Sequence, residues 1–126
     1  MKTLFVSIIG AVALVGSAIA ADTVKVFVLA GQSNMEGKAK NSLLDHQATD
    51  PKTADLFKHL RKGDEWIVRD DAFIKYLGRH GGLTMGYGSP ERTGVELEFG
   101  NVMADHYDEP VLLIKAFGEA MVEMLN

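Results

Sequence analysis

The sequence of 126 residues contains no cysteine, only three prolines and a single tryptophan. The absence of cysteine excludes a disulfide scaffold, a thiolate nucleophile and any zinc site built on cysteine. Basic residues are also few: 13 against 17 acidic residues leave a formal net charge of −4. This balance argues against nucleic acid as a partner, because phosphate contacts need clustered lysine and arginine. Length and composition favour one domain rather than two.

Residues 1–20 are the most apolar part of the chain. Lys2 precedes an apolar stretch over 4–15, and Ala18-Ile19-Ala20 has the small-residue spacing of a signal-peptidase site. The stretch is shorter than the roughly 20 residues that a membrane span needs. We therefore predict a signal peptide over 1–20 with cleavage after Ala20, a secreted or periplasmic product, and no stable membrane span after cleavage. A retained membrane anchor is the alternative.

Two short runs rich in apolar and β-branched residues, 24–30 and 110–116, predict β-strands. The near-continuous apolarity of 26–30 predicts a strand that is buried on both faces. Apolar residues spaced along one helical face predict a helix over 96–107. A strand followed by a helix and a second buried strand is typical of parallel α/β construction.

The middle of the chain is less regular. A short helix is predicted over 53–61, and small strands are predicted at 66–68 and 72–77. The segment 78–94 is rich in glycine and has little periodicity, so we predict a long loop there. Loops of this length inside a domain are commonly functional.

The segment Gly31-Gln32-Ser33-Asn34-Met35 places a serine just beyond a predicted strand. Ligands bind beyond the carboxyl ends of strands in open α/β sheets, and free N–H groups at a helix start can stabilise an oxyanion. A serine nucleophile also needs a histidine that takes its proton. The alternative from position alone is a serine or asparagine that only caps a helix.

Two other motifs fail on this segment. The nucleophile elbow of α/β-hydrolases needs a glycine where Met35 stands. A phosphate-binding loop needs about four residues between its glycines, whereas Gly31 and Gly37 enclose five.

The run over 26–35, with its Gly-Gln-Ser-Asn-Met, resembles the sialate O-acetylesterase-like carbohydrate esterases of the SGNH hydrolase group. The segment 94–100, Gly-Val-Glu-Leu-Glu-Phe-Gly, resembles the second motif of that family, and 111–116 resembles the strand that follows it. The resemblance spans residues 24–116. It implies an α/β fold of the three-layer α/β/α type with a parallel sheet, similar to flavodoxin, and hydrolysis of O-acetyl esters on an acetylated carbohydrate substrate.

The resemblance also implies roles for individual residues. Ser33 would be the nucleophile, and the backbone N–H groups of Ser33 and Gly94 would form part of the oxyanion hole. Gly31, Gln32 and Asn34 would support the serine turn. This chemistry requires no metal and no other cofactor, and the resemblance leaves the oligomeric state open.

Relatives carry an Asp-x-x-His pair downstream of the strand that corresponds to 111–116, and the sequence contains no such pair. We therefore expect residues 21–126 to be the N-terminal portion of a carbohydrate esterase domain. We consider His80, which lies in the glycine-rich segment, as a substitute for the missing histidine base. The alternative is an inactive, truncated or degenerate domain that at most binds carbohydrate.

Overall fold

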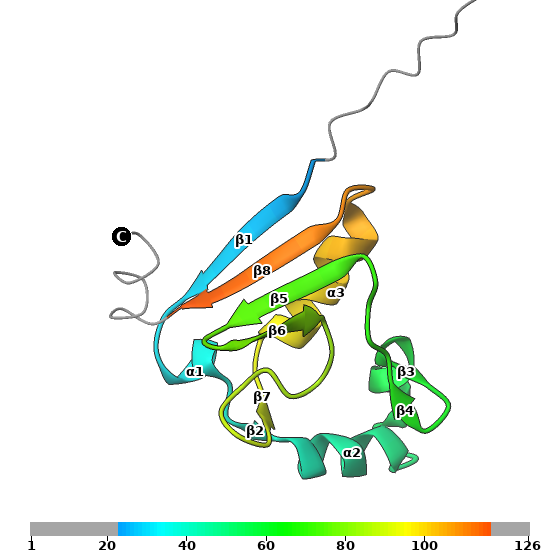
Figure 1. Ribbon diagram of the computed structural model, residues 1–126. Helices are drawn as coiled ribbons and strands as arrows, with labels where there is room; N and C mark the ends of the chain where they lie inside the picture. Colours follow the sequence, from blue (N-terminus) through cyan, green and yellow to red (C-terminus); the bar gives the residue numbers. More distant parts are fainter. Residues whose placement is uncertain (1–22, 117–126) are drawn as a thin grey trace, which may run out of the picture.

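Four strands form the main sheet of the computed structural model, which describes residues 23–116 (Figure 1). The strand order is β1-β8-β5-β6. Strand β8 lies at the centre and pairs in parallel with both β1 and β5, whereas β6 pairs antiparallel with β5. The strands are β1 Lys25–Ala30, β5 Ala72–Tyr76, β6 Arg79–Gly82 and β8 Val111–Ala116. The predicted signal peptide lies outside the described residues.

The remaining elements are short apart from two helices. Strand β2 pairs with β7 and β3 pairs with β4, both antiparallel and away from the main sheet. These elements are α1 Ser33–Glu36, β2 Ala39–Lys40, α2 Asn41–Thr49, the 3-10 helix η1 Ala54–Leu60, β3 Arg61–Lys62, β4 Glu65–Trp66, β7 Arg92–Thr93 and α3 Glu96–His106.

The core lies between α3 and one face of the main sheet. Alternate residues of each strand point to this face, because side chains alternate along a strand. The buried cluster comprises Ala72, Ile74, Leu83, Ala104, Val111 and Leu113. The helix approaches closely at Gly100, where a Cβ atom would meet the side chains of Leu83 and Leu113. Glycine at this position therefore lets α3 lie directly on the centre of the sheet.

The regular elements at the two ends of the described chain agree with the predictions. Strands β1 and β8 confirm the strands over 24–30 and 110–116, and α3 confirms the helix over 96–107. The predicted strand over 72–77 is β5, and the predicted helix over 53–61 is the 3-10 helix η1. Helix α2 has a polar sequence with weak apolar periodicity and was not predicted.

The prediction that the first strand is buried on both faces is wrong for the described residues. Val26 and Val28 are about half exposed. Strand β1 is the outer strand next to β8, and α3 covers only the opposite face, toward which Phe27 and Leu29 point. An apolar run shows that a strand is hydrophobic, but the neighbouring elements decide which of its faces they cover.

The prediction of a loop over 78–94 is wrong in part, and the prediction of a parallel sheet is also wrong in part. Strands β6 and β7 lie within that segment. Strand β6 has the sequence Arg-His-Gly-Gly, which lacks apolar alternation, and it forms through antiparallel pairing with β5. The result is a mixed α/β sheet. No helix within residues 23–116 has the length and apolar character of a membrane-spanning segment.

Candidate active site

Ser33 lies directly beyond the carboxyl end of β1, where the chain turns into α1 (Figure 1). Two backbone hydrogen bonds close this turn. The N–H of Glu36 donates to the carbonyl of Gln32 at 2.9 Å, and the N–H of Gly37 donates to the carbonyl of Ser33 at 3.1 Å. Ser33 is exposed. The structure thus presents a serine at the sheet edge where α/β proteins bind ligands.

The motif residues around Ser33 differ in what they contact. A Cβ atom on Gly31 would lie 2.6 Å from Cγ of Met35, so glycine makes room for that side chain. Gln32 is the N-cap residue of α1, and its side chain makes no capping hydrogen bond. Asn34 borders a surface hollow. Gly31 therefore shapes the serine turn, and Asn34 faces the space beside it.

Gly94 lies against the backbone at the end of the serine turn. A Cβ atom on Gly37 would lie 2.5 Å from the Gly94 nitrogen, and one on Gly94 would lie 2.6 Å from the Gly37 Cα. Gly37 also has a backbone φ angle of +89°, which residues with a Cβ atom rarely adopt. The two glycines bring the backbone of the serine turn into direct contact with the turn before α3.

A buried ion pair joins these two turns. Lys115 of β8 and Glu96 of α3 form it, with Nζ and Oε2 at 2.9 Å and both side chains almost fully buried. The other carboxylate oxygen, Oε1 of Glu96, accepts the Gly94 N–H at 2.8 Å. Lys115 Nζ also donates to the carbonyls of Glu36 at 2.9 Å and Tyr87 at 2.7 Å. Each polar atom of the pair therefore has a partner.

The electrostatic setting of Lys115 reflects this burial. Burial lowers the pKa of the Lys115 ammonium below its ordinary value, while the hydrogen bond and charge of Glu96 oppose the shift. The ammonium also lies over the Tyr76 ring, 4.6 Å from its centroid. A cation over an aromatic face is stabilised by the ring quadrupole. The surroundings therefore offset part of the cost of burying a lysine.

A second brace acts on the side chain of Glu36. The Ser89 hydroxyl donates to Oε1 of Glu36 at 2.6 Å, and Lys38 Nζ lies 2.5 Å from Oε2. These two partners, Lys38 first, lower the pKa of the Glu36 carboxyl. The end of α1 is thus held through its carbonyl by Lys115 and through its side chain by the segment around Ser89.

No hydrogen bond joins Ser33 to a histidine in the part of the chain that the structure describes, which includes all four histidines. His80 lies opposite Lys75 in the β5–β6 pair, so the two side chains share a face of the sheet. The neighbouring Tyr76 points to the other face, over which Lys115 lies. The others are His46 beside Asp50, His59 hydrogen-bonded to Glu98 and His106 against the Tyr107 ring.

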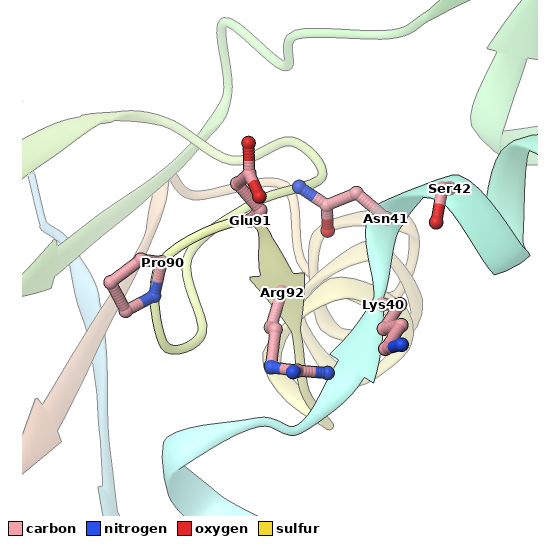
Figure 2. A pocket seen from close by; sticks show the side chains of 6 residues that line it. All are labelled: Lys40, Asn41, Ser42, Pro90, Glu91 and Arg92. Atoms are coloured by element: carbon pink, nitrogen blue, oxygen red, sulfur yellow. The ribbon is translucent and has the colours of Figure 1, made fainter.

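Two hollows lie on either side of the β2–β7 pair. One, of about 700 Å³, is bordered by Asn34 and Gly94 and lined mostly by apolar side chains of α2, η1 and α3. The other, of about 540 Å³, is polar and appears in Figure 2, with Lys40 and Arg92 on adjacent strands and Ser42 at the start of α2. Only the first touches residues next to Ser33. The described residues contain no cluster of three or more His, Asp or Glu side chains that could hold a metal ion.

Sequence reasoning did not identify Gly37, Glu96 or Lys115 as members of this region. A lysine inside the otherwise apolar run 111–116 was a usable signal, because a buried lysine requires a counter-ion. Glu96 lies in the segment that resembles the second motif of the family, but no role was predicted for it. The choice of Glu96 rather than Glu98 as the partner depends on the placement of α3 and could not be read from spacing.

Fold and site together define an α/β protein that presents an exposed serine at the carboxyl edge of its sheet. The family model described as carbohydrate esterase, sialic acid-specific acetylesterase, matches residues 23–122. The chain belongs to this carbohydrate esterase family. No curated protein and no solved structure matches it.

Proposed function

We propose that the protein is a serine esterase that removes O-acetyl groups from carbohydrates, with Ser33 as its nucleophile. The observation that carries this proposal is the exposed Ser33 at the end of β1 in a chain of the carbohydrate esterase family. The finer features of the resemblance, a three-layer α/β/α arrangement and an acetylated carbohydrate substrate, are part of the same proposal.

In the proposed reaction, the Ser33 oxygen attacks the acetyl carbonyl as its proton passes to a base, and the tetrahedral intermediate collapses to an acetyl-enzyme when the sugar oxygen leaves with a proton as a free hydroxyl. Water then hydrolyses the acetyl-enzyme and releases acetate. The backbone N–H groups of Ser33 and Gly94 are the proposed oxyanion donors, because donors aimed at the developing charge lower the barrier. The Gly94 N–H donates to Glu96 in this structure, so the oxyanion would share that hydrogen atom with the carboxylate.

The proposed site contains no assigned general base. Serine is a weak nucleophile until a base accepts its proton, and histidine is the usual base in serine esterases. The histidine positions described above do not supply one in contact with Ser33. Ser33 and the N–H groups of Ser33 and Gly94 are therefore the catalytic groups that we propose for this chain.

Export from the cytoplasm completes the proposal. The apolar residues 1–20 and the small residues before Ala20 support signal-peptide cleavage and a secreted or periplasmic location. Acetylated polysaccharides and glycans occur outside the cytoplasm, so this location agrees with the proposed substrate. The net charge of −4 argues against nucleic acid as the partner.

The test is acetate release by the full chain from an O-acetylated monosaccharide and from an aryl acetate. We expect Ser33→Ala to lower kcat by about three orders of magnitude or more, because removal of a serine nucleophile disables both steps. Ser42→Ala is the matched control, since Ser42 is also an exposed serine in the first turn of a helix. This variant should keep wild-type activity.

Equal activity of Ser33→Ala and wild type would overturn the assignment of Ser33. A folded wild-type protein that releases no acetate but binds the acetylated sugar would instead establish the alternative, a binding domain without esterase activity. Sugar binding can be measured by the chemical-shift changes of backbone amides near Asn34 and Gly94 on titration.

A further inference from the structure

Lys115 is a lysine that is almost fully buried and has three separate hydrogen-bond acceptors. Its side chain is 1% exposed. The acceptors are Oε2 of Glu96, the carbonyl of Glu36 and the carbonyl of Tyr87, so the three N–H bonds of the ammonium are all used. The acceptors come from α3, from the end of α1 and from the segment between β6 and β7. One side chain therefore ties three separate segments to the end of β8.

Stability alone does not account for a charged pair at this place. Withdrawing two charges from water carries a large desolvation cost, and apolar side chains of similar volume often stabilise a protein as well or better. The surrounding core already consists of apolar residues such as Leu113 and Ile74. What an apolar pair cannot do is hold backbone carbonyls at fixed positions.

The carbonyl of Glu36 is the contact that concerns Ser33. Helix α1 contains only the four residues from Ser33 to Glu36. A single helical turn is unstable by itself, because nucleation fixes several backbone angles for one hydrogen bond. No residue of α1 is buried. The turn therefore depends on contacts at its end, and the Lys115 ammonium supplies one to the Glu36 backbone at 2.9 Å.

We propose that Lys115 is the positioning residue of the Ser33 turn: its buried ammonium, neutralised by Glu96, holds the Glu36 carbonyl and fixes Ser33 relative to the Gly94 turn. Glu96 contributes to the same arrangement from the other side, because its Oε1 holds the Gly94 N–H while its Oε2 holds Lys115. The effect on catalysis rests on the proposed function. The effect on the turn does not depend on it.

The test is the double variant Lys115→Met with Glu96→Gln. It leaves no unpaired buried charge, and the glutamine carbonyl can still accept the Gly94 N–H. The variant loses the ammonium that reaches Glu36 and Tyr87, and the Glu96 carboxylate becomes a neutral amide. We expect the amide hydrogens of Glu36 and Gly37, which close the turn, to exchange about tenfold faster by NMR, while those of Leu113 and Ile74 change by less than about threefold.

On an aryl acetate, the same variant should lower kcat by about tenfold with KM changed by less than about twofold, because a misplaced nucleophile affects the transition state rather than binding. Arg69→Met is the control. Arg69 pairs with Asp71 and Asp105, and these ion pairs include no residue of the candidate site around Ser33. It should leave kcat and the exchange of the turn amides unchanged.

If Glu36 and Gly37 exchange in the double variant as slowly as in Arg69→Met, the proposal is wrong. Should the methionine variant fail to fold, Lys115→Leu with Glu96→Gln also removes every side-chain donor at position 115, and it must give the same two results. An inactive wild-type protein would refute the esterase proposal, whereas the exchange of the turn amides would still decide the role of Lys115.

Discussion

Two charged clusters connect α3 to the rest of the molecule, and they differ in how far they are removed from water. At the start of α3, Glu96 and Lys115 have side-chain exposures of 0% and 1%. Farther along, Arg69 is 18% exposed, and its carboxylate partners Asp71 and Asp105 are 48% and 67% exposed. Both clusters contain short charge-assisted hydrogen bonds. Only the first directs its donors at backbone carbonyls of the candidate site.

This difference separates two uses of charge in one small fold. In the Arg69 cluster, the guanidinium binds Asp71 through two nitrogens at 2.7 and 2.8 Å, and the partner carboxylates stay solvated when the bond breaks. In the buried pair, loss of one partner leaves the other charge buried, with neither a counter-ion nor water to solvate it. The Arg69 cluster fastens α3 near the surface, whereas the buried pair determines where the backbone lies.

The largest expected effect comes from breaking the buried pair on one side. We expect Lys115→Met alone to lower the free energy of unfolding by about 3–5 kcal/mol, because the Glu96 carboxylate is left buried and uncompensated. We expect Arg69→Met to cost about 1 kcal/mol, since its partners reach solvent. Urea unfolding of both variants at neutral pH measures the two values. Equal losses would remove the distinction between the clusters.

The second effect tests whether the glycine contact acts at the same edge as the buried pair. Gly37→Ala places a Cβ 2.5 Å from the Gly94 nitrogen at a φ of +89°. We expect a loss of about 1–3 kcal/mol, together with a fall in any esterase activity. Gly78→Ala is the matched control, because nothing lies within 4 Å of its Cβ position. Thermal unfolding should separate the two alanine variants clearly.

The smallest expected effect is on the loss of thermal stability at acidic pH. Arg69 lowers the pKa of the Asp71 carboxyl below its ordinary value. A lowered pKa means that the folded protein binds fewer protons than the unfolded chain, so this contribution is present above about pH 4 and is lost as the pH falls further. We expect Asp71→Asn to lose less Tm than wild type on acidification, by about 1–3 °C.

The control for this measurement is Asp70→Asn, which changes an exposed neighbour of the same charge. It should follow the wild-type acid dependence. An identical Tm decrease for Asp71→Asn and wild type would mean that solvent already screens the Arg69 pair. The contrast between the two clusters would then be larger than the distances suggest.

The elements that local pattern predicted are those whose residues carry their own periodicity. The apolar run of β8 and the apolar face of α3 are visible in any short window, and both elements form where they were expected. Strand β6 was missed because its sequence has no such pattern and gains its structure from pairing with β5. Backbone hydrogen bonds between strands carry no sequence signature of their own.

The candidate site divides in the same way. The place of Ser33 follows from a strand end and a glycine, both local features, and the structure places it there. The contact of Gly37 with Gly94 joins residues that are 57 positions apart in the sequence. The pairing of Lys115 with Glu96 requires β8 to run back along α3, so that the end of the strand lies beside the start of the helix. No spacing rule connects such positions.

The sequence by itself determined the α/β class, the main strands and helix, and a serine at the end of the first strand, because apolar periodicity and turn residues act over a few positions. Only the tertiary structure decided which face of β1 is covered, that β6 runs antiparallel, and that Lys115 holds the turn of Ser33. The physical reason is that burial and charge pairing are properties of neighbours in space, which the packing of α3 against the sheet brings together.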